Sequence, residues 1–316
     1  MPAPDSAFLR MVEPHQGALR LHCYRMLGSS QDSDDMMQET LVRAWRAKDT
    51  LDEPSRLRSW LYRIATNACL DELRNRKARP LPSAVVPAAE NPDAPALPPR
   101  PEVTWLQPCP DAWLAGAAQD PGAAYEVKES VALAFVAALQ CLSAQQRAVL
   151  LLRDVLGMPA DETASTLGMS VSAASSTLHR ARAAVRERAG DAQASEVDAE
   201  LLGKYLRAWE SLDLQALVKL LHEDVVTTMP PSPTWLRGRE ATRRFLDEHA
   251  MRGLRPNPPR LLRTGANGQP AFAFYVRGHL SAIHVLGFRE GRVVTCDHFM
   301  GEECFGAFGL PASISN

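Results

Sequence analysis

The chain has 316 residues, 46% of them hydrophobic, and a formal net charge of −2 at pH 7. This length exceeds one typical domain and suits two or three units with apolar cores. No apolar run approaches the ~18–20 residues that cross a bilayer, and the N-terminus lacks a signal-peptide pattern, so we expect a cytoplasmic protein without membrane association. Six cysteines without a CxxC pair favour buried thiols over a disulfide or metal framework.

The first segment, residues 5–79, is helical in pattern. Between residues 33 and 45 apolar residues recur at spacings of three and four, as on the buried side of a helix. This stripe comprises Met37, Leu41, Ala44 and Trp45. The polar side, open to a partner or to solvent, carries Asp34, Asp35, Gln38 and Glu39.

A second helix is predicted over residues 55–79, which hold seven Lys or Arg against two acids. Leu57, Leu61, Ile64 and Ala68 form its apolar side. A basic helix end can neutralise phosphates, although basic residues there also suit the helix dipole. Its polar side and basic C-terminal end carry Arg58, Arg63, Asn67, Arg74, Arg76, Lys77 and Arg79. Of these, the residues predicted to contact nucleic acid are Arg58, Asn67, Arg74, Arg76 and Lys77. For Trp60 we favour a core position over base stacking.

Residues 80–124 are predicted to form a proline-rich linker. Of the 24 prolines, 11 fall between residues 80 and 121. Proline lacks the N–H that a helix or central strand needs, which favours an extended tether that lets its neighbours take many relative positions.

Residues 125–189 are again helical and contain a helix-turn-helix pattern. A helix over 145–153 ends at Gly157, and Pro159 opens a second over 160–167 that Gly168 closes. Ser170 is the expected N-cap of a third helix. Its inward side should be Val171, Ala174, Leu178, Ala181 and Val185. Its exposed side, suited to a DNA major groove and flanking phosphates, is Ser172, Ala173, Ser175, Ser176, His179, Arg180 and Arg182.

After a polar joint at 190–197, residues 198–316 change to an α+β pattern. Helices are predicted over 201–209, 214–222 and 239–250, and strands over 225–229, 260–265, 271–279, 282–289 and 292–300, with turns at Asn267-Gly268 and Glu290-Gly291. A curved antiparallel sheet enclosing the helices would make a cone. The polar residues available to a cavity are His279, His284, Asp297 and His298. Neighbours on a strand face opposite sides, so we favour structural histidines over an Asp297–His298 catalytic pair.

The motifs of the first segment, from Asp34 to Trp45 and from Arg58 to Arg74, closely resemble region 2 of sigma-70-family factors in order and spacing. This resemblance implies that Asp34, Asp35, Gln38 and Glu39 bind the clamp helices of the RNA polymerase β′ subunit. It also implies that the second helix recognises the −10 promoter element and helps to melt it.

The later segment, with Ser143-Ala-Gln-Gln-Arg147, Asp161-Glu-Thr-Ala164 and Leu178-His-Arg-Ala-Arg182, is similar to sigma-70 region 4, which reads the −35 element and contacts the β flap. Ala174 and Ser175 stand where the family more often has a valine and a larger polar residue, which leaves the base preference open. No region 3 intervenes, as in sigma factors of the extracytoplasmic-function (ECF) type. The Trp105–Asp111 stretch resembles a segment of sigma factors with C-terminal extensions.

The run from Met229 to Gly238 before a helix resembles SnoaL-like domains. The whole therefore predicts a multidomain sigma factor, with two all-α regions and an α+β SnoaL-like cone that regulates them or senses a small-molecule ligand. It implies promoter DNA and core RNA polymerase as partners, no cofactor or metal, and no catalytic residues. One alternative is a SnoaL-like enzyme fused to a DNA-binding module. Another is a two-site DNA-binding regulator that never joins polymerase, although the acidic helix around Asp34 argues against it.

Overall fold

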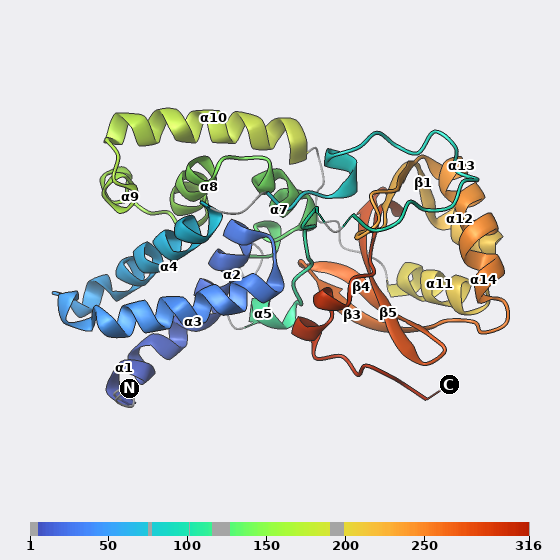
Figure 1. Cartoon of the computed structure of the whole chain (residues 1–316), viewed down its shortest axis with the longest axis horizontal. Helices are drawn as coiled ribbons and strands as arrows, with labels where there is room; N and C mark the ends of the chain where they lie inside the picture. The colour runs from blue at the N-terminus through green and yellow to red at the C-terminus, as the bar shows by residue number, and fades with distance from the viewer. Residues whose placement is uncertain (1–5, 75–77, 101, 116–126, 190–198, 316) are drawn as a thin grey trace. The chain divides into compact units, whose positions relative to one another are not determined.

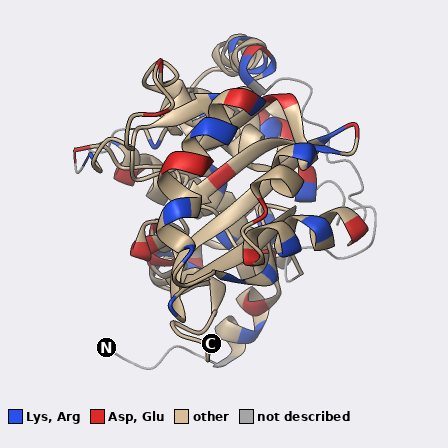
Figure 2. Cartoon of the chain, turned by 90° about the vertical axis from the view of Figure 1, so that its right-hand side faces the viewer, with Lys and Arg blue, Asp and Glu red and all other residues tan. Residues whose placement is uncertain are grey.

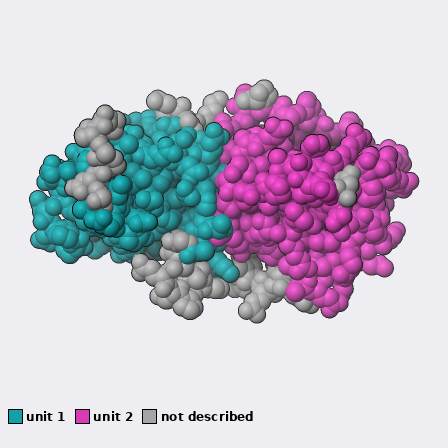
Figure 3. All heavy atoms as spheres, turned by 90° about the horizontal axis from the view of Figure 1, so that it is seen from below, with its two compact units in different colours: residues 1–79, 112–190 teal, residues 80–111, 191–316 magenta. Residues whose placement is uncertain are grey.

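The computed structural model describes residues 6–74, 78–100, 102–115, 127–189 and 199–315. The chain divides into two compact units (Figure 3), residues 1–79 with 112–190 and residues 80–111 with 191–316. The division does not follow chain order, because much of the proline-rich segment belongs to the second unit. In the part of the chain that is described, no helix combines the length and apolarity needed to span a membrane.

The first unit begins with the helices α1 (Ser6–Val12), α2 (Gln16–Leu27), α3 (Ser30–Arg46) and α4 (Leu57–Leu73) (Figure 1). Short 3₁₀ turns cover Glu13–His15, Lys48–Thr50 and Pro54–Arg56. Gly28, with φ of 68°, ends α2, and the Ser29 side chain caps α3 by accepting from the Asp32 N–H at 3.1 Å.

The helix predicted over residues 55–79 corresponds to α4 and is shorter than expected. It ends at Leu73, and Ala78 and Arg79 are not helical. Arg79 is buried and pairs with Asp32 near the start of α3, so it is not part of an exposed basic helix end. The long-range ion pair outweighs local helix propensity at this position.

The rest of the first unit comprises α5 (Ala112–Ala115), α7 (Leu133–Gln140), α8 (Ala144–Leu150), a π-helical turn (Leu151–Val155), α9 (Ala160–Leu167) and α10 (Val171–Ala189). Gly168, with φ of 62°, closes α9, and the Ser170 hydroxyl accepts from the Ala173 N–H at 3.1 Å. The predicted helix-turn-helix is confirmed. Val171 was wrongly placed inside, because as the first residue of α10 it remains 46% exposed.

These two groups of helices share one apolar core, in which Leu61 and Cys69 of α4 join Val149 and Leu152. A buried guanidinium, that of Arg147 on α8, also connects them. It donates to the Met26 carbonyl at the end of α2, to the carbonyls of Leu139 (2.9 Å) and Leu142 (3.3 Å), and to the Gln140 amide oxygen (2.8 Å). Arg25 of α2 in turn donates to the Ser130 hydroxyl at 2.6 Å and to its carbonyl at 3.0 Å.

The second unit is built on a six-stranded sheet in the order β2-β1-β6-β5-β4-β3. Its strands are β1 (Leu221–Thr228), β2 (Trp235–Arg237), β3 (Arg260–Ala266), β4 (Gln269–Val276), β5 (His279–Arg289) and β6 (Arg292–Phe299). The sheet is mixed, since β1 pairs parallel with β6. The prediction of a purely antiparallel sheet was therefore wrong, and β2 was missed.

The strands β3 to β6 form hairpins with tight turns. Asn267-Gly268 and Glu290-Gly291 have positive φ at both positions, between 51° and 70°, as the sequence predicted and as type I′ turns require. A third such turn, Arg277-Gly278, has φ of 52° and 77°. This turn was not predicted, because arginine seldom adopts a positive φ.

The helices of the second unit are α11 (Ala199–Glu210), α12 (Leu214–Leu220), α13 (Arg239–Phe245), a π-helical continuation (Leu246–Met251) and α14 (Arg252–Leu254). Short 3₁₀ turns occur at Pro82–Ala84, Glu302–Cys304 and Gly306–Phe308. Tyr205 stacks on Phe272 with ring centroids 5.2 Å apart, and Trp209 meets the Phe274 ring edge-on at 5.2 Å. These contacts fix α11 on one face of the sheet.

Adjacent residues of β6 point to opposite faces, as expected. His298 faces His284 of β5, whereas the buried carboxylate of Asp297 accepts from the Thr228 hydroxyl of β1 at 2.6 Å. Burial raises the pKa of Asp297 from 3.8 to about 6, with the Thr228 hydrogen bond acting in the opposite direction.

We predict that Asp297→Asn stabilises the protein at neutral pH. The unfolded carboxyl ionises near pH 3.8 and the folded one near 6, so its contribution is most favourable below pH 3.8 and is lost as pH rises through about 6. The difference corresponds to about 3 kcal/mol of unfolding free energy, because one pKa unit is about 1.36 kcal/mol. Denaturant unfolding of both proteins at pH 4 and 7.5 measures this. An equal difference between them at both pH values would contradict the prediction.

Candidate nucleic-acid and polymerase interface

The acidic face predicted to bind polymerase lies on α3. Asp34, Asp35, Gln38 and Glu39 share one side of the helix by spacing. Asp35 and Gln38 are exposed. Asp34 and Glu39 are instead partly shielded by cations, because an Asp34 carboxylate oxygen lies 2.9 Å from Arg20 Nε and Glu39 Oε1 lies 2.7 Å from Arg43 Nε. Among the described residues, the part of this face without intramolecular ion pairs is therefore centred on Asp35 and Gln38.

The residues predicted to contact the −10 element fall on two sides of α4. Asn67 and Arg74 lie seven positions apart, close to two full turns, and both are exposed. Arg58, nine positions or two and a half turns before Asn67, lies on the opposite side of the helix, with its guanidinium carbon 5.6 Å from the centroid of the Tyr62 ring. Arg76 and Lys77 lie outside the described residues. The exposed Arg63, four positions before Asn67, shares the Asn67–Arg74 face and was not among the predicted site residues.

Trp60 is 5% exposed, and its indole N–H donates to the Thr50 hydroxyl at 3.3 Å. The expected core position of this side chain is confirmed. Stacking on bases would require it to leave the apolar core that it shares with Leu61.

The predicted DNA-facing side of α10 is fully exposed. Its residues are Ser172, Ala173, Ser175, Ser176, His179, Arg180 and Arg182. The buried side is formed by Ala174, Leu178 and Ala181. The helix therefore presents a continuous polar surface, with small side chains in its first turns and cations further along, opposite the row that packs inside.

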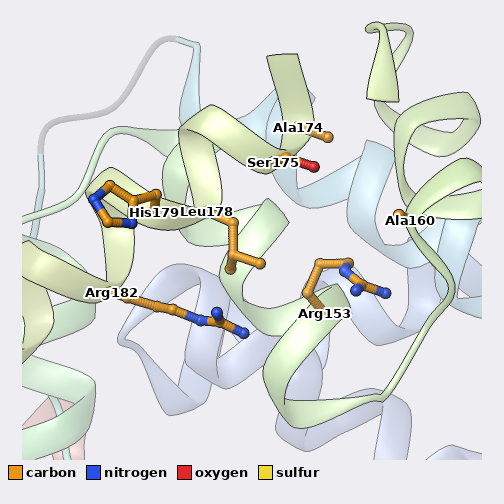
Figure 4. A pocket seen from close by; sticks show the side chains of 7 residues that line it. All are labelled: Arg153, Ala160, Ala174, Ser175, Leu178, His179 and Arg182. Atoms are coloured by element: carbon orange, nitrogen blue, oxygen red, sulfur yellow. The ribbon is translucent and has the colours of Figure 1, made fainter. Parts of the chain in front are cut away.

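A hollow of about 300 Å³ lies beside α10 (Figure 4). It is lined by Arg153, Ala160, Ala174, Ser175, Leu178, His179 and Arg182. The Arg182 guanidinium binds both carboxylate oxygens of Asp154, at 2.6 and 2.8 Å. An Arg180 guanidinium nitrogen lies 3.4 Å from the Thr177 hydroxyl. Of the two arginines of α10 predicted to bind phosphate, Arg182 is therefore already paired with Asp154.

The linker segment, defined as residues 80–111, is attached to the second unit rather than free. Near its start, the Trp235 indole donates to the Val86 carbonyl at 2.8 Å, and the Ala89 N–H donates to the Trp235 carbonyl at 2.9 Å. Further along, the Leu97 N–H donates to the Thr234 hydroxyl, and the Ser232 hydroxyl donates to the Leu97 carbonyl, both at 2.8 Å. These bonds run along β2 and the loop before it.

Side-chain contacts hold the middle and the end of the linker segment. Asp93 pairs with Arg244 of α13, with one oxygen 2.9 Å from Nε. The Cys109 N–H donates to the Asn267 amide oxygen at 3.0 Å, and an Asp111 carboxylate oxygen accepts from the Gly268 N–H at 2.7 Å. A side chain at Gly265 would overlap the Asp111 carboxylate, so glycine permits this approach. The expected free tether is thus bound at several points within its unit.

The interior of the cone contains a closed polar network. The rings of His284 and His298 stack at 3.9 Å, the Tyr205 hydroxyl lies 3.1 Å from His284 Nδ1, and Cys296 Sγ lies 2.8 Å from His298 Nε2. Burial lowers the pKa of both histidines, that of His298 to about 4, and raises the pKa of Cys296 to about 12. All three groups are therefore neutral, in agreement with structural histidines. Within the described residues no group of three or more His, Cys, Asp or Glu is placed to hold a metal ion.

On the side shown in Figure 2, the second unit carries both basic and acidic residues. On α13, for example, Arg243 pairs with Glu240 at 2.8 Å.

Together, two exposed polar helix faces on one helical unit and an attached α+β cone define a helix-turn-helix nucleic-acid-binding protein with an accessory domain. Comparison with known families agrees and is more specific. Residues 11–79 match Sigma-70 region 2, residues 132–185 match Sigma-70 region 4, and residues 202–299 match the SnoaL-like domain.

The chain is 42% identical to the ECF RNA polymerase sigma factor SigG of Mycobacterium tuberculosis, over 97% of this chain and 85% of that protein. It is 31% identical to the ECF RNA polymerase sigma factor SigJ of the same organism, over 72% of this chain and 70% of the relative. The chain belongs to the ECF RNA polymerase sigma factor family. It is thus a non-enzymatic subunit of RNA polymerase that acts on promoter DNA. A crystal structure of M. tuberculosis SigJ has the same fold, with a TM-score of 0.62 and 24% identity over 97% of this chain and 99% of that one.

We predict that Asp154→Asn strengthens binding of the full chain to −35 duplex DNA. The change releases Arg182, and one additional phosphate contact should steepen the dependence of log affinity on log salt by about 0.9. Loss of this exposed ion pair should cost about 1 kcal/mol or less of stability. The measurement is fluorescence anisotropy across a salt series.

The matched control is Asp161→Asn, which removes the same charge from an exposed position at the start of α9. It should leave the salt slope unchanged. If both variants gain affinity equally, or neither does, the Asp154 contact does not withhold Arg182 from DNA.

Proposed function

We propose that α3 binds core RNA polymerase through Asp35, Gln38 and the flanking acids Asp34 and Glu39, while α4 and α10 read different promoter elements. The observation that carries this proposal is the presence of two separate exposed polar faces, on α3 and on α10, within one helical unit. A DNA-binding regulator without polymerase would gain nothing from the acidic face. By resemblance, the partner of α3 is the clamp helix pair of β′, the partner of the helix-turn-helix is the β flap, and the protein acts in the cytoplasm.

We further propose a division of roles between the two DNA-facing helices. Arg74, with Asn67 and the basic residues that follow, supports −10 recognition and strand opening. Ser175, Ser176 and Arg180 on α10 contact the −35 element, where small residues allow close approach and the arginine binds phosphate.

We predict that Asp35→Lys weakens core binding by about tenfold or more, through reversal of an exposed charge at the centre of the acidic face. Asp35 is a cleaner site than Glu39, since exchange of Glu39 also removes its ion pair with Arg43. The control is Asp49→Lys, an exposed acid in the 3₁₀ turn after α3. Affinity for core polymerase is measured with purified components. Equal affinity of Asp35→Lys and wild type would rule out this face as the polymerase site.

The C-terminal cone, we propose, modulates sigma activity by holding the linker segment. That segment connects the two DNA-binding regions, and its hydrogen bonds with Trp235, Asn267 and Arg244 fix it to the cone's surface. A bound linker limits how far the regions before and after it can separate. This role requires no ligand in the cone, and a small-molecule ligand remains a prediction from the resemblance.

Release of the linker should raise promoter-dependent transcription severalfold. We predict this for truncation after residue 197 and for the double variant Arg244→Met with Asn267→Gly, in which glycine tolerates the positive φ of 57°. Arg243→Met is the control, because the neighbouring Arg243 pairs with acids of its own helical segment. Run-off transcription at matched concentrations provides the measurement. Equal activity of the full-length, truncated and double-variant proteins would mean that the cone does not regulate through the linker.

A further inference from the structure

Four charged side chains form a continuous series from α3 to the end of α4, two helices that pack against each other. Glu39 Oε1 lies 2.7 Å from Arg43 Nε, and Arg43 Nη1 lies 2.8 Å from Asp71 Oδ2. The other carboxylate oxygen, Asp71 Oδ1, lies 3.1 Å from Arg74 Nη1. The two ends of the series are residues assigned above to polymerase and to promoter DNA.

The two middle members are each shared between competing partners. Arg43 divides its guanidinium between Glu39 and Asp71, and hydrogen bonds with these carboxylates, that with Glu39 first, raise its pKa. Asp71 divides its carboxylate between Arg43 and Arg74. All four side chains are between 34% and 76% exposed, so each contact is individually weak. Weak, shared contacts can be redistributed by a stronger external partner.

We propose that Arg43 and Asp71 are positioning residues that couple polymerase binding at Glu39 to promoter binding at Arg74. The inference rests on the proposed function, which places these two residues at the respective surfaces. A cation of the polymerase that binds Glu39 draws it away from Arg43. Arg43 then binds Asp71 alone, which weakens the hold of Asp71 on Arg74. The freed Arg74 becomes available to a phosphate.

The same sequence of exchanges operates in reverse. A phosphate that binds Arg74 leaves Asp71 to Arg43, and Arg43 then releases Glu39 to the polymerase. Reciprocity is required, because a coupling free energy between two sites has one value whichever partner binds first. The charges alternate along the series, so the coupling free energy is favourable and each partner strengthens the binding of the other.

A purely structural role would have a different signature. If Arg43 only fastened α3 to α4, its removal would lower stability and weaken both binding events, yet their mutual enhancement would persist. The discriminating quantity is therefore the coupling factor. We define it as the affinity of the full chain for core polymerase with saturating −10 single-stranded oligonucleotide, divided by the affinity without it.

The experiment compares this factor in wild type, Arg43→Met, Asp71→Asn and the double variant. We expect each single change to lower it by about two- to fivefold, the range of weak ion-pair energies, and the double change to lower it no further. The control is Arg46→Met, which removes the same charge from an exposed position one turn further along α3. Arg46→Met should keep the wild-type factor. Thermal unfolding of each variant confirms that the fold is retained.

An unchanged coupling factor in Arg43→Met, or an equal decrease in Arg46→Met, would overturn the proposal. So would additive effects in the double variant, because members of one series cannot act independently. These outcomes differ from failure of the proposed function. In that case Asp35→Lys would leave core affinity intact, whereas failure of the coupling alone would leave the Asp35 effect in place.

Discussion

The buried guanidinium of Arg147 is the interaction on which the helical unit depends. Within the described residues its hydrogen bonds go to carbonyl and amide oxygens and to no carboxylate, and one of those carbonyls, that of Met26, belongs to the negative end of the α2 dipole. Burial lowers the pKa of Arg147 only to about 10, so the group stays charged at neutral pH. Loss of these hydrogen bonds would leave a buried charge without partners, which strongly lowers the free energy of unfolding. This residue of sigma region 4 therefore fixes the end of a region 2 helix.

This packing imposes a geometric constraint on promoter recognition. The −10 and −35 elements lie about 25 base pairs apart, or ~85 Å along B-DNA at ~3.4 Å per base pair. In the structure α4 packs directly against α8 and α9, and the axes of packed helices are ~8–10 Å apart. On the proposed assignment of α4 to the −10 element and α10 to the −35 element, the two faces cannot reach both elements while that interface is closed. The proposal therefore implies that the interface opens, which would expose Arg147 and the end of α2 to water. In the proposed role of the cone, the bound linker segment would oppose the same separation.

The features that the sequence predicted correctly are those that depend on residues close together in the chain. The helix-turn-helix followed from Gly168 and Ser170, and the I′ turns from Asn267 and Glu290, because caps and turns depend on neighbouring residues. Partners distant in sequence were not predictable. Nothing near Arg79 indicates Asp32, and the prolines that favoured a free tether gave no sign of the cone surface that binds it. The parallel pairing of β1 with β6 depends on how the whole chain returns to the sheet. At the candidate site, exposure of the α10 face was predictable, whereas the Asp154–Arg182 pair was not.

The chemistry of the cone's interior indicates where its role must lie. An acid–base site needs a titratable group that exchanges protons near neutral pH and faces a space that substrate can enter. Here Tyr205, His284, Cys296 and His298 satisfy one another, and burial holds them neutral. Asp297, whose pKa burial raises to about 6, lies on the opposite face of the sheet and accepts a hydrogen bond from Thr228. The polar contacts that hold the linker segment lie apart from this network, along β2, α13 and the turn at Asn267. This arrangement supports the proposal that the cone acts through the linker segment bound on it, because the polar side chains of the interior are already paired with one another.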